Sequence, residues 1–239
     1  MGTGVRTLPD RPDRVVAVSV GVLWGRKHRE NRPELLPVTG VGVVVADIAT
    51  GDVIVERRDL LEADDLKIVA EHLLDLKLPI ITYNGLRFDL VALGSVVDVD
   101  RLIPHTIDVY SALYRCAAEI VNAEGASGFP VRGDYGVLHP QRVAETNIGH
   151  VPGSNEDAIG EAELALALWH HFVTYERAIV AGRTHVLDDS GLELLRGEQP
   201  AFADADEWRT ALADRPEPKP YRRRDRNQIT FPRVDQRYV

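Results

Sequence analysis

The chain has 239 residues, of which 44% are hydrophobic and 27% charged, and this supplies enough apolar material for one sizeable core. A single cysteine, Cys116, excludes an internal disulfide framework and a cysteine-rich zinc site. The longest apolar runs, at 15–23 and 41–46, are too short to cross a bilayer, and the N-terminal region lacks the apolar segment of a signal peptide, so we expect a soluble, cytoplasmic protein.

The net charge of −9 is unevenly distributed along the chain. Residues 215–239 contain eight Lys and Arg against three Asp and Glu, a net of +5, so residues 1–214 carry −14. This division predicts an acidic body followed by a basic tail.

Hydrophobic periodicity predicts strands in the first part of the chain and an alternation of strands and helices after it. Residues 1–14 are polar and Pro-rich, which is typical of a flexible arm. The predicted elements are, in chain order, strands at 15–23, 40–48 and 52–57, a helix at 64–76, a strand at 78–82, a helix at 86–93, a strand at 107–109, helices at 111–121, 140–147 and 155–173, and a hairpin-like piece after Gly182.

This order of elements predicts the fold class. Three leading strands joined by short turns indicate an antiparallel meander, and the later strand–helix alternation indicates parallel additions to the same sheet. We therefore expect an α/β protein with a mixed five-stranded sheet and helices on both faces, which is the ribonuclease H-like arrangement. The expected organisation is an arm at 1–14, one domain at 15–196 and a Pro- and Arg-rich tail at 197–239.

The segment TYNGLRFDLVAL, residues 82–93, ends a predicted strand in Asn84-Gly85 and places Asp89 at the start of the next helix. Taken alone, it is explained by a turn, since Asn and Gly tolerate positive φ, and by a carboxylate that complements the helix dipole. In its surroundings, however, it resembles the second motif of the DEDD superfamily of 3′–5′ exonucleases, in the branch predicted as ribonuclease H-like nucleases. The resemblance implies that Asn84 fixes the turn, that Phe88 packs in the core and that Asp89 faces a metal site.

Further segments resemble the same branch in the same order, from about residue 15 to 195. They are VGVVVADIATGDVIVE for the second and third strands, PHTIDVYSAL for a strand end and helix, LHPQRVAETNIGH and EAELALALWHHF for two later helices, and YERAIVAGRTHVLDDSG for a closing hairpin.

The first motif of the family is degenerate in this chain. Enzymes of this type hydrolyse phosphodiesters with two divalent metals held by four carboxylates, two of which come from one face of the first strand. Here that strand reads RVVAVSVGVLW, and Ser19 and Gly21 stand at the carboxylate positions. Asp47 is an alternative ligand, but its spacing from Asn84 leaves room for only one strand and one helix and places it at the far end of the sheet.

The last motif is altered as well. Glu161 takes the position of the family Asp, and Asp157 takes that of a Tyr. Residues at i and i+4 share a helix face, so both carboxylates can point toward Asp89. A solvated acidic first turn that complements the helix dipole is the alternative that the sequence favours. Asp108 either lines the same end of the sheet or caps the next helix. No histidine stands four or five residues before Glu161, and His150 is too distant to be a general base.

The tail carries Arg222, Arg223, Arg224 and Arg226 close to aromatic residues. Arginines bind phosphates and aromatic rings stack on bases, so these four residues, together with Asn84 at the turn, are the candidate nucleic-acid contacts. A solubilising tail, a strap on the acidic body and a docking segment for a partner protein are the alternatives.

Two functional hypotheses follow. In the first, the chain is an exonuclease-like protein with an incomplete metal site that acts as a nucleic-acid-binding or scaffold subunit with little or no nuclease activity. In the second, it is an active 3′–5′ exonuclease that uses Mg²⁺ or Mn²⁺ on a reorganised carboxylate set, Asp89, Asp157 and Glu161, with Asp89 and Glu161 as the metal ligands. The expected partners are single-stranded DNA or RNA and, through the C-terminal tail, a partner protein, with no membrane.

Overall fold

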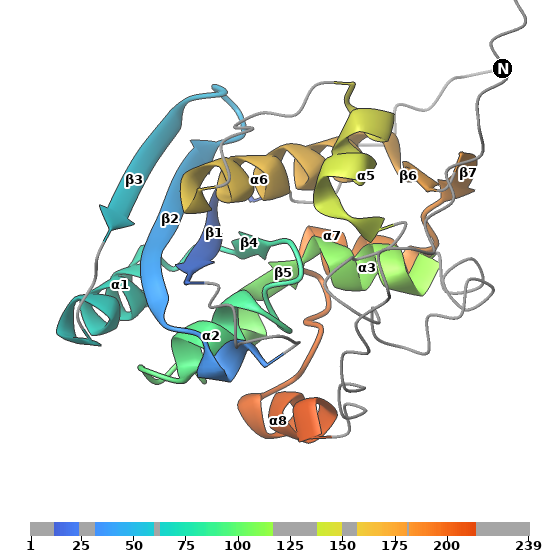
Figure 1. Ribbon diagram of the computed structural model, residues 1–239. Coiled ribbons are helices and arrows are strands. Elements are labelled where there is room, and N and C mark those ends of the chain that lie inside the picture. The colour runs from blue at the N-terminus through green and yellow to red at the C-terminus, as the bar shows by residue number, and fades with distance from the viewer. Residues whose placement is uncertain are drawn as a thin grey trace, which may run out of the picture.

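The computed structural model describes residues 12–23, 32–59, 63–116, 138–149, 157–180 and 182–213. Its centre is a five-stranded sheet in the order β3-β2-β1-β4-β5 (Figure 1). The strands are β1 (Arg14–Val22), β2 (Val38–Asp47), β3 (Val53–Asp59), β4 (Ile80–Thr82) and β5 (Thr106–Asp108). The first three are antiparallel, whereas β4 is parallel to β1 and β5 to β4. This topology confirms the predicted α/β fold with a mixed, ribonuclease H-like sheet.

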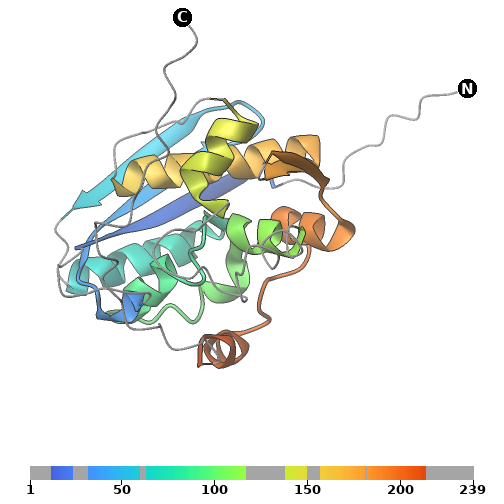
Figure 2. The same ribbon diagram turned by 45° about the vertical axis from the view of Figure 1, so that its right-hand side comes forward.

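Helices cover both faces of the sheet, as Figures 1 and 2 show. The helices are α1 (Ala63–Leu76), α2 (Asp89–Gly94), α3 (Val109–Cys116), α5 (Pro140–Asn147), α6 (Ala158–Tyr175), α7 (Asp189–Arg196) and α8 (Ala205–Ala213), with short 3₁₀ turns at Pro33–Leu35 and Ile103–His105. One core cluster joins one face of the sheet to α3, α5, α6 and α7, and a second joins the other face to α1, α2 and α8.

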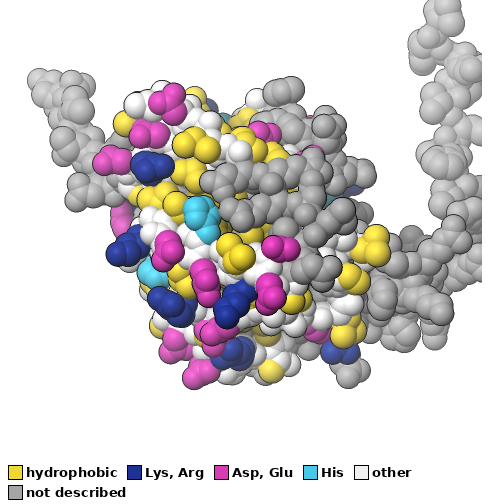
Figure 3. Space-filling model, turned by 90° about the vertical axis from the view of Figure 1, so that its left-hand side faces the viewer, with side chains coloured by type: hydrophobic (Ala, Val, Ile, Leu, Met, Phe, Trp, Pro, Cys, Tyr) yellow, Lys and Arg dark blue, Asp and Glu magenta, His cyan; other side chains and the backbone are white. Residues whose placement is uncertain are grey.

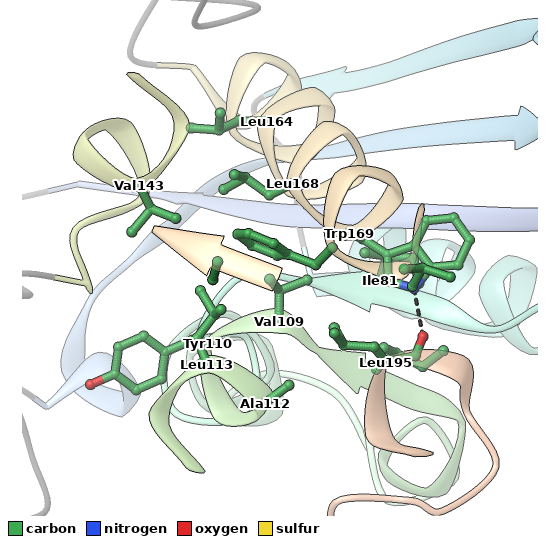
Figure 4. Packing of buried hydrophobic residues seen from close by; sticks show 14 of the residues in the cluster. Ile81, Val109, Tyr110, Ala112, Leu113, Val143, Leu164, Leu168, Trp169 and Leu195 are labelled. Atoms are coloured by element: carbon green, nitrogen blue, oxygen red, sulfur yellow. Dashed lines mark hydrogen bonds between the residues drawn. The ribbon is translucent and has the colours of Figure 1, made fainter. Parts of the chain in front are cut away.

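The alternation of side chains along β1 decides which residues meet which helices. Val15 and Ala17 belong to the core on the α6 face, and Val16 and Val18 belong to the core on the α1 face. Because successive side chains of a strand point to opposite faces, Ser19 continues the series that faces α6. The α6 core contains the largest buried side chain, Trp169, whose ring nitrogen donates to the carbonyl of Leu195 at 2.7 Å (Figure 4).

The sheet ends at β3, and no strand of the described residues pairs with the outer edge of β3. Val53, Ile54 and Val55 are exposed there, and Figure 3, which views this side of the molecule, shows hydrophobic side chains among charged ones of both signs. At the other end of the fold, β6 (Arg177–Val180) and β7 (Arg183–Val186) form a separate antiparallel hairpin, as expected.

Two predicted elements differ from the structure. The segment after the hairpin forms α7, because Asp188 caps its first turn by accepting from the Gly191 amide at 2.8 Å. Within the expected tail at 197–239, α8 forms and buries Trp208, whose ring nitrogen donates to the Leu86 carbonyl at 2.7 Å. One large aromatic anchors an otherwise polar helix, and periodicity does not detect such an anchor.

The remaining predictions differ in their bounds or lie elsewhere. The first helix turn after β4 starts at Asp89, and residues 85–88 form turns before it. The expected arm, apart from residues 12–14, and the segment 214–239 lie outside the described residues. In the part of the chain that the structure describes, no helix is long and apolar enough to cross a membrane.

Candidate functional site

A pocket of about 540 Å³ opens beside the C-terminal half of β1. Its volume lies within the range of small-molecule sites. Its walls come from β1, the start of β2, the β4–α2 turn and the N-termini of α5 and α6. The polar and aromatic side chains that line it are Ser19, Thr39, Tyr83, Phe88, Asp89, His139, Gln141, Asp157 and Glu161.

Ser19 lies between two carboxyl groups at the floor of this pocket. Its Oγ is 3.1 Å from Oδ1 of Asp89 and 2.8 Å from Oε2 of Glu161. The same Asp89 oxygen also accepts the Val20 amide at 2.6 Å. The structure therefore places Ser19 beside Asp89, as the order of motifs predicts, and Gly21 lines the same pocket.

Glycine at position 42 allows Glu161 to reach Ser19. Gly42 is paired with Ser19 across the β1–β2 ladder, and α6 begins directly above it. A Cβ on Gly42 would lie 2.3 Å from the Ala158 carbonyl oxygen, so the first turn of α6 rests on bare backbone. Because Glu161 belongs to this turn, the close approach brings its carboxylate over β1.

The electrostatics of the site favour a protonated carboxyl group. Burial raises the pKa of Asp89 to about 7, and the negative charge of Glu161 acts in the same direction, against the lowering effect of the hydrogen bonds from Val20 and Ser19. The geometry agrees with this direction. A serine hydroxyl has one proton and two carboxyl neighbours, so a proton on one of the carboxyl groups gives each of the two contacts a hydrogen of its own.

We predict a stability that depends on the protonation of Asp89. Between its ordinary pKa of 3.8 and about 7, the folded state binds a proton that the unfolded state has released, so the free energy of unfolding falls as pH rises through this window. The loss is on the order of 4 kcal/mol. Asp89→Asn removes the titration, and we expect its urea unfolding to show a flatter pH profile between pH 4 and 8.

The matched control for this experiment is Asp157→Asn, which changes a carboxylate of the same pocket and leaves Asp89 in place. It should keep the slope of the wild type. Equal slopes for Asp89→Asn and the wild type would contradict an Asp89 proton held by the fold.

Asp157 lies one turn before Glu161 and lines the same pocket, but it has a capping role that the sequence did not predict. It precedes α6 as the N-cap residue, and its Oδ1 accepts the Gly160 amide at 2.8 Å. The prediction placed it one helical turn before Glu161 on the same face. Asp157 does line the pocket, but no hydrogen bond in the described residues joins it to Asp89.

Asp108 is a structural residue at this end of the sheet. It accepts hydrogen bonds from the amides of Asn84, Leu86 and Ser111, at 3.3, 2.9 and 2.9 Å. It therefore ties the β4–α2 turn to the start of α3. Two roles were predicted for Asp108, lining this end of the sheet or capping the next helix, and the structure shows the cap.

Asn84 has the positive φ of 64° that the turn requires. It is only 5% exposed, and its side-chain oxygen has no hydrogen-bond partner among the described residues. It is not among the residues that line the pocket, so the structure gives it the role in the turn and shows no surface for a nucleic-acid contact.

Asp47 lies at the far end of β1 from the site. It pairs with Arg14, five residues before Ser19, and accepts the amides of Ala49 and Thr50 in the β2–β3 turn. This agrees with the predicted position of Asp47 outside the site.

Two residues of the pocket wall have positions that the sequence did not predict. Phe88 is half-buried and lines the pocket, whereas the family resemblance implied a core position. His139 reaches the pocket from the N-cap of α5, although it is not in the sequence position of a family general base. The His139-Pro140 pair at the start of α5 is the sequence feature from which a position of His139 at the helix N-terminus could have been predicted. His150 and Arg222, Arg223, Arg224 and Arg226 lie outside the described residues.

The residues of this site do not fit the two-metal centre of the exonuclease family. No group of three or more His, Cys, Asp or Glu side chains in the described ranges is arranged to hold a metal ion. The two carboxyl groups that meet are joined by the Ser19 hydroxyl, and Gly21 contributes no ligand. Asp89 and Glu161 as metal ligands stay a prediction, and no third side chain of the described residues completes a metal-binding cluster with them.

Comparisons with known proteins add a distant similarity. No protein-family model matches the chain, and no curated protein matches it. Among solved structures, the chain is similar to E. coli exonuclease I in complex with a 5cy-dT13 oligonucleotide, with a TM-score of 0.40 and 15% sequence identity. The match covers 69% of this chain and 41% of that one, so it spans less than half the length of that exonuclease.

Proposed function

We propose that this protein is an exonuclease-like member of the ribonuclease H fold whose carboxylate site no longer supports efficient hydrolysis, and that it acts as a nucleic-acid-binding or scaffold subunit. The observation that carries the proposal is the position of Ser19, whose hydroxyl joins Asp89 to Glu161. The relation to the DEDD superfamily is part of the proposal and rests on the ordered motifs of the sequence.

A hydroxyl cannot replace the carboxylate that this chemistry needs. Two-metal hydrolysis uses anionic oxygen ligands that hold the ions and balance their charge. Ser19 is neutral and already bonded within the protein, and Gly21 has no side chain. The alternative is an active exonuclease on Asp89, Asp157 and Glu161, in which Asp157 would also have to serve as the N-cap of α6, since its Oδ1 accepts the Gly160 amide.

We expect the wild-type protein to degrade labelled single-stranded DNA and RNA at least about 1,000-fold more slowly than a relative with all four carboxylates. This is the scale of the several kcal/mol that metal ions contribute to the transition state. The measurement is degradation in Mg²⁺ and in Mn²⁺, with Asp89→Ala as the control for a contaminating nuclease. Robust degradation that Asp89→Ala abolishes would favour the active-enzyme hypothesis.

The binding function belongs, in this proposal, to the basic segment. Residues 215–239 carry +5 against −14 for the rest of the chain, so phosphates are attracted to the segment and repelled by the body. We expect Arg222→Ser, Arg223→Ser, Arg224→Ser and Arg226→Ser together to weaken binding of single strands and to flatten the plot of log K against log salt by about 3. Fluorescence anisotropy at several salt concentrations measures both, and unchanged affinity would remove the segment from the proposed function.

A further inference from the structure

Helix α8 is attached to the rest of the domain mainly by one buried side chain. Trp208 is 4% exposed, whereas Ala205 and Leu212 on the same helix are only partly buried. The Arg209 guanidinium pairs with Asp100, but both side chains are partly exposed, and such ion pairs stabilise a fold only slightly. An element with so few buried contacts opens more readily than the core of a domain. The contacts of Trp208 therefore decide how firmly α8 is docked.

Trp208 supplies a hydrogen bond that the main chain of α2 does not. In a regular α-helix the Leu90 amide would donate to the Leu86 carbonyl, four residues earlier. Here the Leu90 amide donates to the Gly85 carbonyl at 2.8 Å, a step of five residues, and no main-chain amide of the described residues reaches the Leu86 carbonyl. The Trp208 ring nitrogen donates to that carbonyl instead, at 2.7 Å. Because a buried carbonyl without a donor is costly, the widened turn and the docked indole depend on each other.

Asp108 holds Leu86 from the other side. The Leu86 amide donates to Oδ2 of Asp108 at 2.9 Å, and within the described residues none of the hydrogen-bond donors of Asp108 belongs to α8. If α8 leaves, Leu86 therefore stays in place through its amide, and the residues that follow it are free to move. Figure 1 shows α8 beside α2 and away from α6, and Trp208 belongs to the core on the α1/α2 face. The helix can therefore affect the site only through the β4–α2 turn.

This turn carries Asp89 to an open position on β1. The pairing of β1 with β4 ends at Ala17. The Val16 amide donates to the Pro79 carbonyl on that edge, and amides of alternate residues point to the same edge of a strand, so the Val20 amide points there too. Oδ1 of Asp89 accepts the Val20 amide at 2.6 Å. The hydrogen bond of the Val20 amide therefore reports where the start of α2 lies.

We propose that α8 is a detachable clamp, which in its docked state holds α2 in the widened turn and Asp89 at Val20. When the Trp208 indole leaves, the Leu90 amide satisfies the Leu86 carbonyl by moving to it from its present acceptor. The turn then shortens by one residue, which in a helix corresponds to about 1.5 Å of rise and about 100° of rotation. A hydrogen bond of 2.6 Å between Asp89 and Val20 does not survive such a shift, so Asp89 leaves the site.

The first experiment measures hydrogen exchange in the full wild-type chain by NMR, at several low urea concentrations. It compares the Trp208 indole, the Val20 amide and the Trp169 indole. The two indoles are matched, because each donates to a main-chain carbonyl at 2.7 Å in one of the two cores. We expect the Trp208 indole and the Val20 amide to show the same protection factor, through one local opening that urea barely affects. The Trp169 indole should be at least about tenfold more protected, since it exchanges by global unfolding.

Two results of this experiment would overturn the clamp. A Val20 amide as protected as the Trp169 indole, beside a weakly protected Trp208 indole, would show that α8 leaves without moving Asp89. Equal protection at all three sites would show that α8 does not leave the folded domain.

The second experiment removes the donor and keeps a ring in the core. Trp208→Phe should lower the protection of the Val20 amide about tenfold, the scale of one buried hydrogen bond, and should move the ¹³Cα shifts of residues 86–88 toward helical values. The matched control is Trp169→Phe, which loses the same kind of bond in the other core and should leave those shifts unchanged. Unchanged shifts in Trp208→Phe, or equal changes in both variants, would contradict the clamp.

The clamp does not rest on the proposed function. Neither experiment contains a nucleic acid or a metal ion. A failure of the clamp therefore leaves the proposed function standing, and a chain that binds no nucleic acid can still show the coupling between Trp208 and Val20.

Discussion

Replacing Ser19 with aspartate should make the stability of the fold depend on a divalent cation. Ser19 is 5% exposed and lies about 3 Å from both carboxyl groups, so the Ser19→Asp substitution adds a third acidic group to a buried cluster. Without a cation we expect the free energy of unfolding at pH 8 to fall by about 3 kcal/mol or more, because an unpaired buried charge is costly.

Three carboxylates also complete an oxygen donor set. We therefore expect Mn²⁺ or Mg²⁺ at millimolar concentration to raise the melting temperature of Ser19→Asp by several degrees, since a ligand that binds only the folded state stabilises it. The wild type should respond little. Differential scanning calorimetry with and without the ion, in the presence and absence of a chelator, makes the comparison.

Ser19→Asn is the control for size, because the asparagine side chain has nearly the shape of aspartate without the charge. It should show no stabilisation by the metal ion. A wild type stabilised as strongly as Ser19→Asp would contradict the conclusion that the natural site lacks a donor set. A Ser19→Asp variant that ignores the ion would show that a single substitution does not rebuild the site.

Gly42→Ala should destabilise the fold by about 3 kcal/mol, a large effect for the addition of one methyl group. The new Cβ would lie 2.3 and 2.4 Å from the carbonyl oxygen and carbon of Ala158 and 2.6 Å from the amide of Ile159. All three are backbone atoms, so the first turn of α6 has to move. Glu161 moves with it, and its contact with Ser19 is lost.

Gly21→Ala is the matched control, on the neighbouring strand and under the same helix. Its Cβ would meet the Thr39 hydroxyl at 3.3 Å and the Ala158 Cβ at 3.7 Å, both side-chain atoms. We expect a change below about 1 kcal/mol, partly offset because Ala fits a strand better than Gly does. Urea unfolding of both variants decides the matter, and equal midpoints would refute the close approach of α6 to Gly42.

Local sequence predicts the elements whose signals are local. The valine runs give β1 and β2 because β-branched side chains suit a buried strand, and the bounds of α5 agree with the predicted 140–147 because Pro140 and the following periodicity are sequence signals. The Asn84-Gly85 turn follows from backbone preference alone. The gap in the first motif at Ser19 and Gly21 is also visible in the sequence, since it concerns which residue types are present.

The contacts between side chains of distant segments depend on the packing of the whole domain. Ser19 and Glu161 are 142 residues apart, and their contact depends on the backbone of α6 resting on Gly42, which no periodicity encodes. Asp157 lies at the N-cap because α6 begins one residue after it, a boundary that an acidic run leaves open. His139 and Trp208 likewise acquire their positions from packing.

Residue types and local preferences therefore account for the sheet, the turn and the missing carboxylates. The serine hydroxyl that joins two acids follows from the three-dimensional packing, because such a contact depends on distances between elements that local preferences do not set.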